Sequence, residues 1–322
     1  MSRHRRWTYT NPVHPGYLAD PFVLRHGGGY YAYGTNTVDP SPNAFEILRS
    51  DDLVHWTSLG RALPAVDGLD ARDHWAPEVA EHGGRFHLYF SAGVEDRGHG
   101  LRVAVADRPE GPFGHTGGIL TPDELFAIDP HPFRDDDGTW YLYYARDRLE
   151  GERVGTSLVV DRLVDMVGLA GEPVPVLTAT ADWQLFQRER PMYGAIYDWY
   201  TLEGPFVVKR LGRYWCLYSG GAWTSTDYGV SFAVADSPLG PFSESDVTGP
   251  ALLRSLPGQL EGPGHCSVVV VGADGQDYLV YHAWDPDHRA RRMCIDRLEW
   301  TVDGPRTNGP TAEPQPVPAA LS

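Results

Sequence analysis

The chain has 322 residues, a formal net charge of −16, 42% hydrophobic residues and 12% aromatic residues. This hydrophobic content is enough for a sizeable core, so extensive intrinsic disorder is excluded. The acidic balance argues against a nucleic-acid surface and against binding to anionic membranes, and it favours a neutral substrate. The many tryptophans, tyrosines, glycines and prolines indicate a mostly β protein with short strands and many turns.

The cysteines and the amino terminus predict the redox state of the thiols and the location of the protein in the cell. Cys216, Cys266 and Cys294 are far apart and form no C-x-x-C pair, so we expect buried reduced thiols rather than disulfides or a zinc site. The basic segment 1–17 is not followed by an apolar run, and no stretch reaches the roughly 20 apolar residues of a membrane span. We therefore expect a cytoplasmic protein that does not bind membranes. Its oligomeric state is left open.

Five segments share one pattern: a proline, an apolar pair, a turn with glycine, and then alternating aromatic residues. Each predicts a β-hairpin, and a further strand pattern follows most of them. The runs VAVADRPEGPF and FAVADSPLGPF are nearly duplicated. A unit of about 60 residues that recurs five times is typical of a five-bladed β-propeller, here a single all-β domain over residues 1–322. The repeated segments surround Pro21, Pro77, Pro130, Pro205 and Pro263.

A β-sandwich also has many short strands, but it gives no reason for five matched segments at matched spacing. The widest interval contains residues 181–200, an aromatic-rich stretch with Pro191 and Gly194, which predicts an inserted loop that shapes a binding site. The proline-rich tail, residues 303–322, is expected to pack as coil or to fray.

Candidate catalytic residues lie at the starts of the predicted hairpins. In a propeller these positions converge at one end of the axis, and they hold Asp20, Asp129 and Glu203 in apolar surroundings. An Asp-Pro pair is also a common turn opener, but a carboxylate in apolar surroundings is costly without a partner or a function. Two acids across a pocket are what hydrolysis of a glycosidic bond requires. Nearby tryptophans are candidate sugar platforms, with core packing as the alternative: Trp75, Trp199 and Trp223.

The motifs ADPFVL, HWAPEV, AIDPHPFRDDDGTWYLYY, LEGPFVVKRLGRYWCLYSGG and GPGHCSVV together resemble glycoside hydrolase family 43, whose members are five-bladed propellers that act on plant cell-wall polysaccharides with inversion. The resemblance implies that Asp20 is the general base and Glu203 the general acid. Asp129 would orient Glu203 and raise its pKa. His265 would help to hold a hydrated calcium or another ion at the substrate site. Arg292 would reach the sugar, with pairing to a surface acid as an equal alternative.

The resemblance implies no cofactor for the chemistry. We expect a small oligosaccharide as substrate, because the sequence shows neither a secretion signal nor an appended carbohydrate-binding module. We expect an exo-acting α-L-arabinofuranosidase, because the insert before Glu203 would close one end of the pocket. A β-xylosidase, an endo-arabinanase and a non-catalytic sugar-binding propeller are the alternatives. A retaining, sucrose-cleaving propeller would carry Arg-Asp-Pro and Glu-Cys-Pro where this chain has Ile128-Asp129-Pro130 and Glu203-Gly204-Pro205.

Overall fold

The computed structural model describes residues 8–36, 44–64, 72–244, 248–271 and 275–318. Strands and turns dominate this part of the chain, and its one 3₁₀ helix is η1 (Asp182–Gln184). No helix among the described residues is long and apolar enough to cross a membrane. The all-β class predicted from composition is confirmed.

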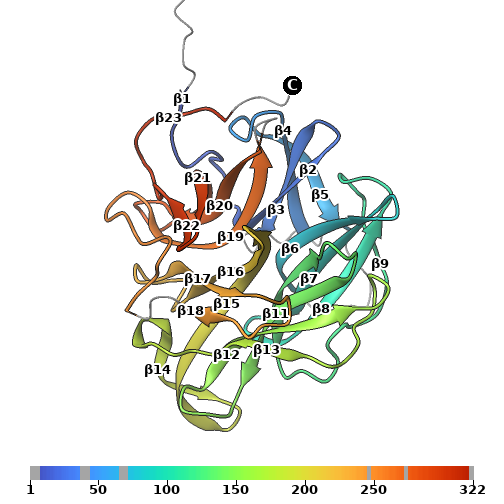
Figure 1. The fold of residues 1–322 in the computed structure, drawn as a ribbon, viewed down its shortest axis with the longest axis vertical. Helices are drawn as coiled ribbons and strands as arrows, with labels where there is room; N and C mark the ends of the chain where they lie inside the picture. The colour runs from blue at the N-terminus through green and yellow to red at the C-terminus, as the bar shows by residue number, and fades with distance from the viewer. Residues whose placement is uncertain (1–7, 37–43, 65–71, 245–247, 272–274, 319–322) are drawn as a thin grey trace, which may run out of the picture.

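The strands form antiparallel four-stranded units, which we number blades 1 to 5 in chain order (Figure 1). Blade 1 contains β2 (Ala19–His26), β3 (Gly29–Thr35), β4 (Ala44–Ser50) and β5 (Thr57–Leu63). Blade 2 contains β6 (Asp73–His82), β7 (Arg85–Val94), β8 (Arg97–Ala106) and β9 (Gly114–His115). Blade 3 contains β10 (Ala127–Arg134), β11 (Trp140–Arg148), β12 (Gly155–Leu163) and β13 (Val174–Leu177). Blade 4 contains β15 (Ala195–Arg210), β16 (Arg213–Gly220), β17 (Gly229–Ala235) and β18 (Ser243–Glu244). Blade 5 contains β19 (Glu261–Val271), β20 (Gln276–Trp284), β21 (Arg291–Thr301) and β22 (Gly304–Thr307).

The first strands of the blades surround a common axis. Contacts run from β2 to β6, from β6 to β10, from β10 to β15, from β15 to β19, and from β19 back to β2. This closed cycle is the propeller predicted from the five repeated segments, and each repeated hairpin supplies the first two strands of one blade. The inner strands therefore bring residues from five distant parts of the sequence together.

The insert before Glu203 is a β-hairpin, so the expected loop is wrong. β14 (Leu185–Met192) pairs with the first half of β15, and the turn at Tyr193-Gly194 has positive φ at both residues, as a tight two-residue turn requires. The hairpin is also joined to blade 3 by parallel pairing of β12 with β15. That pairing needs a glycine at Gly155, because a Cβ there would lie 1.8 Å from the Tyr200 carbonyl oxygen.

The proline-rich tail is irregular at 308–314 and 317–318, as expected for packed coil, but 304–307 and 315–316 form short strands that the expectation missed; residues 319–322 lie outside the described part. β22 completes blade 5, and β23 (Gln315–Pro316) pairs with β1 (Thr8–Tyr9). Asn11 donates hydrogen bonds from Nδ2 to the carbonyls of Ile295 and Thr311, at 2.9 and 3.1 Å. The segments around Asn11 and Thr311 are thereby held against blade 5.

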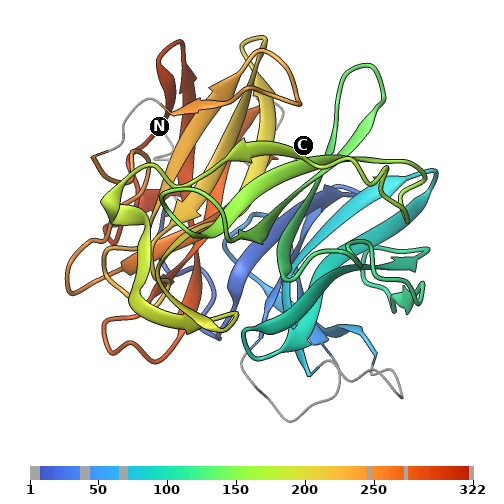
Figure 2. The same ribbon diagram turned by 90° about the horizontal axis from the view of Figure 1, so that it is seen from below.

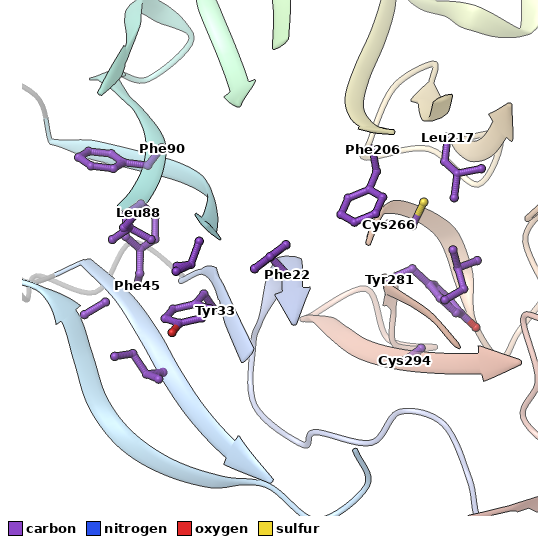
Figure 3. Packing of buried hydrophobic residues seen from close by; sticks show 14 of the residues in the cluster. Phe22, Tyr33, Phe45, Leu88, Phe90, Phe206, Leu217, Cys266, Tyr281 and Cys294 are labelled. Atoms are coloured by element: carbon purple, nitrogen blue, oxygen red, sulfur yellow. The ribbon is translucent and has the colours of Figure 1, made fainter. Parts of the chain in front are cut away.

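Packing between blades follows the sequence repeat. In the two near-duplicate runs, Phe113 and Phe242 are buried, and the hydroxyls of Tyr33 and Tyr143 donate to the carbonyls of Pro109 and Pro238. Figure 3 shows a cluster that packs between neighbouring blades and includes aromatic side chains and two buried thiols. All three cysteines are buried and free, as predicted.

Candidate active site

All five inner strands break their pairing register: β15 breaks midway along its length, the other four break in their first half, and β19 breaks twice. At each break one residue has positive φ, between 46° and 59°. Such a break turns a side chain out of the regular alternation of a strand, and strained backbone of this kind gathers at functional sites. The residues with this conformation are Asp20, Ala76, Asp129, Gly204, Gly262 and His265.

These breaks bring the predicted carboxylates together at one end of the axis. His265 Nδ1 lies 3.5 Å from Asp20 Oδ1 and 3.9 Å from Asp129 Oδ2. The backbone N–H of Gly204 donates to Asp129 Oδ2 at 2.9 Å, which places Asp129 directly beside the backbone of Glu203. Asp20 and Asp129 are buried and Glu203 is partly buried.

Asp20 lies in a cationic environment. Arg291 Nη1 lies 3.4 Å from Asp20 Oδ1, and His282 Nδ1 lies 3.3 Å from the same oxygen. Burial by itself would raise the pKa of Asp20, but Arg291, His265 and His282 together lower it far below the ordinary carboxyl value. Asp20 is therefore ionised throughout the neutral range.

Glu203 lies in the opposite kind of environment. Burial and the charge of Asp20 raise the pKa of Glu203 to about 7, although Tyr228, which donates from its hydroxyl to Glu203 Oε1 at 2.6 Å, favours the ionised form. Burial and the neighbouring charges of Glu203 and Asp20 raise the pKa of Asp129 well above its ordinary value. One ionised and one protonatable carboxyl group thus face the same site near neutral pH.

Two glycines make this packing possible. Gly204 has a φ of 57°, and a Cβ there would lie 3.1 Å from Cγ of His265. A Cβ at Gly264 would lie 1.8 Å from Cε1 of Tyr228. Larger residues at these positions would displace the His265 ring or the Tyr228 ring.

Arg291 contacts the candidate base, whereas Arg292 forms the ion pair that was the alternative to a sugar contact. Arg292 is bound to Asp285, with Nη2 2.9 Å from Oδ2, which was the alternative. Arg291 contacts Asp20, and its Nη2 donates a hydrogen bond to the hydroxyl oxygen of Tyr17 at 2.8 Å. The reason is the alternation of β21, which points neighbouring side chains to opposite faces.

The three candidate tryptophans differ in exposure. Trp199 is 1% exposed and packs inside the hairpin insert, so the prediction of a sugar platform is wrong for this residue. Trp75 is half-buried and stacks on His99 with ring centroids 3.8 Å apart. Trp223 is half-buried and stacks on Trp284, and Arg291 Cζ lies 4.4 Å from the centre of its ring. Trp223 is thus connected to Asp20 through Arg291.

The hairpin of β14 and β15 extends past the carboxylates. Glu203 lies midway along β15, so the half of the strand that precedes it continues beyond the end of the axis where the acids meet. Arg190 Nη2 lies 2.5 Å from Asp96 Oδ2 in blade 2, and the Tyr193 hydroxyl donates to Asp147 Oδ2 in blade 3 at 2.6 Å. Figure 2 shows the hairpin reaching across from blade 4 to blades 2 and 3.

A directly coordinated metal does not fit the residues around His265. Within the described ranges, no group of three or more His, Cys, Asp or Glu side chains could hold a metal ion. Calcium prefers six to eight oxygen ligands, whereas Nδ1 of His265 faces only the carboxylates of Asp20 and Asp129. A hydrated ion held through water by His265 stays a prediction.

Sequence reasoning missed Tyr228, His282 and Ser219, whose side chains all lie within the site. They come from the second strands of blades 4 and 5 and from the residue before β17. No local motif marks them, because only the register between strands turns them towards the carboxylates. Arg291 could have been predicted in part, because the sequence already pointed to the adjacent Arg292 as a candidate contact to the sugar.

Known proteins share this architecture. Residues 9–305 match the family described as "Glycosyl hydrolases family 43". A β-D-galactofuranosidase of Aspergillus niger is 32% identical over 91% of this chain and 83% of its own length. An extracellular exo-α-(1→5)-L-arabinofuranosidase of Streptomyces avermitilis is 27% identical over 92% of this chain and 62% of its own length. A crystal structure of a thermostable family-43 glycoside hydrolase has a TM-score of 0.84 at 34% identity and covers 97% of this chain and 100% of that one. The chain belongs to glycosyl hydrolase family 43.

Proposed function

We propose that this glycoside hydrolase releases terminal α-L-arabinofuranosyl residues with inversion of configuration. The observation that carries the proposal is the contrast between Asp20, held ionised by Arg291, and Glu203, whose pKa is raised to about 7. A carboxylate that accepts a proton and a carboxylic acid that gives one are the two partners of single-step glycoside hydrolysis.

In the proposed reaction, the Glu203 proton passes to the glycosidic oxygen as the bond from that oxygen to the anomeric carbon breaks. Asp20 accepts a proton from the water molecule whose oxygen bonds to the same carbon from the opposite face. Asp129 contacts no reacting atom in this scheme. It holds the Gly204 N–H and, through the backbone, the position of Glu203.

The exo preference is supported by the β14–β15 hairpin. An endo-acting enzyme needs a groove that accepts sugar on both sides of the cleaved bond, whereas the hairpin is anchored across blades 2 and 3 by Arg190 and Tyr193. A barrier on one side restricts the site to a chain end. The exo-acting relative from Streptomyces avermitilis agrees with this mode.

β-D-Galactofuranosidase activity is the second candidate, because the relative from Aspergillus niger is 32% identical over most of both chains. β-D-Galactofuranose and α-L-arabinofuranose share the configuration of the ring and differ in the substituent at C4, which is one carbon longer in galactofuranose. The same pair of acids can therefore catalyse hydrolysis of either sugar, and the space around the C4 substituent decides which sugar is bound.

The test is to incubate the purified protein with arabino-, galactofuranosyl- and xylo-oligosaccharides and to follow the anomeric protons by NMR from the first minutes. We expect a free terminal arabinose whose first-formed anomer is inverted. Galactofuranose as the faster product would select the second candidate, and internal cleavage would overturn the exo mode. Retention would overturn the role of Asp20, and turnover of no sugar would favour a binding propeller. The Glu203→Gln variant is the control for contaminating activity.

A further inference from the structure

Tyr228 is fixed against Glu203 from three sides. It is 1% exposed and directly precedes β17. Its ring lies parallel to that of His282, at an interplanar angle of 3° and a centroid distance of 6.1 Å. Gly264 also packs against the ring, since a Cβ there would lie 1.8 Å from Cε1 of Tyr228. The hydroxyl therefore has little freedom, and it donates to Glu203 Oε1 at 2.6 Å.

A second buried hydroxyl, that of Ser219, lies close to the hydrogen bond between Tyr228 and Glu203. Ser219 is fully buried and lies directly opposite Glu203 in the pairing of β15 with β16. Its Oγ accepts the backbone N–H of His265 at 2.8 Å, and its side chain lowers the pKa of Tyr228 against the larger upward effect of burial. A neighbour that lowers the pKa of a tyrosine stabilises the negative charge on its oxygen, which is the effect of a donor, and the proton of Tyr228 itself points to Glu203.

We propose that Tyr228 is a positioning residue that occupies Oε1 of Glu203, so that the proton delivered to the leaving group is carried on Oε2. This proposal rests on the proposed function, in which Glu203 is the general acid. Ser219 strengthens the contact by donating to Tyr228, because hydrogen bonds in such a chain polarise one another. Without Tyr228 either oxygen of Glu203 carries the proton, and the side chain is free to rotate.

The chemistry of the three groups agrees with this role. Burial and the adjacent Glu203 raise the pKa of Tyr228 well above its ordinary value, so its hydroxyl remains a donor over the working pH range. The hydrogen bond from Tyr228 opposes the upward effect of burial on the pKa of Glu203. Loss of the hydroxyl therefore raises the pKa of Glu203 and weakens control over its orientation.

The test is Tyr228→Phe, which keeps the ring and its packing and removes only the hydroxyl. We expect the basic limb of the kcat/KM profile against pH to move upward by roughly one unit. With the disaccharide of the sugar that the enzyme releases, kcat falls by about 10- to 100-fold with little change in KM. With the 4-nitrophenyl glycoside of the same sugar, kcat falls by less than about threefold, because a good leaving group needs little protonation.

Two further variants separate positioning from general damage. Ser219→Ala should shift the basic limb in the same direction by a smaller amount. Tyr89→Phe is the matched control: Tyr89 is fully buried and its hydroxyl donates to the Met166 carbonyl at 2.7 Å, so the basic limb should not move. A limb that stays in place in Tyr228→Phe, or equal losses on both substrates, would overturn the proposal. Full activity of Glu203→Gln on the disaccharide would instead overturn the proposed function.

Discussion

The two ends of the inner strands differ in backbone and in chemistry. At the carboxylate end, every inner strand breaks its register and carries a residue with positive φ. Towards the other end the pairing is regular, and apolar side chains such as Phe22 and Phe206 meet with ring centroids 6.5 Å apart (Figure 3). The same five strands thus provide a strained, charged site at one end and a packed core beside it.

The difference between the two ends shows how buried carboxylates are stabilised in this propeller. The carboxylates at the broken end have partners, including the guanidinium of Arg291 on Asp20 and the Gly204 N–H on Asp129. Strained backbone costs of order 1–3 kcal/mol per residue and persists only where its surroundings fix it. The regular end supplies that support, since Phe206 lies three residues after Glu203 on the same strand.

The largest effect is expected from removing the reacting groups. Asp20→Asn or Glu203→Gln should lower kcat on the natural oligosaccharide by about 10²- to 10⁴-fold, because each removes one proton-transfer partner. Initial rates measure the loss, and circular dichroism checks that the fold is intact. Retention of more than a tenth of the activity by either variant would contradict its catalytic assignment.

At the regular end, a change should cost stability. Phe206→Ala removes a 6% exposed ring whose centroid lies 4.2 Å from that of His131. We expect the free energy of unfolding to fall by about 3–5 kcal/mol, measured by urea denaturation. Val302→Ala, at a residue that is 83% exposed, is the control and should change stability by less than about 0.5 kcal/mol. A similar loss in both variants would remove the contrast between core and surface.

The pH dependence of kcat/KM sharpens the contrast between the two acids. Because the pKa of Glu203 is raised to about 7, its protonated form is lost as the pH rises through this value, and kcat/KM should then fall about tenfold per pH unit. The lowered pKa of Asp20 keeps this base ionised, so the acidic limb should lie below the ordinary carboxyl range. A profile that is flat from pH 6 to pH 9 would contradict the role of Glu203.

The neighbouring arginines of β21 offer the smallest contrast. Arg291→Met removes the cation 3.4 Å from Asp20, so the pKa of Asp20 rises and the acidic limb moves upward. Arg292→Met removes only the partly exposed pair with Asp285, which should cost at most about 1 kcal/mol of unfolding free energy and leave the limb in place. Equal shifts of the acidic limb in the two variants would contradict the assignment of Arg291, rather than Arg292, as the cation that lowers the pKa of Asp20.

Much of the fold could be predicted because the repeat depends on residue types at short, fixed spacing. The prolines, glycine turns and alternating aromatic residues identified the hairpins that start the blades; Asp20 and Asp129 stand near the starts of their strands, and Glu203 lies midway along β15. The insert was misread as a loop because Pro191 suggested a break, whereas an edge strand such as β14 tolerates proline. The strand β23 in the tail was missed because it pairs with β1, which lies at the other end of the sequence.

The sequence by itself determined the β class, the repeat and the three acids, because these depend on residue types at fixed local spacing. The tertiary structure alone decided that Arg291 rather than Arg292 meets Asp20, that Trp199 is buried, and that Tyr228 holds Glu203. Each of these depends on strand register and on which face of a strand a side chain occupies. A shift of one residue in register exchanges the two faces, so contacts between distant strands are fixed only when the blades close around the axis.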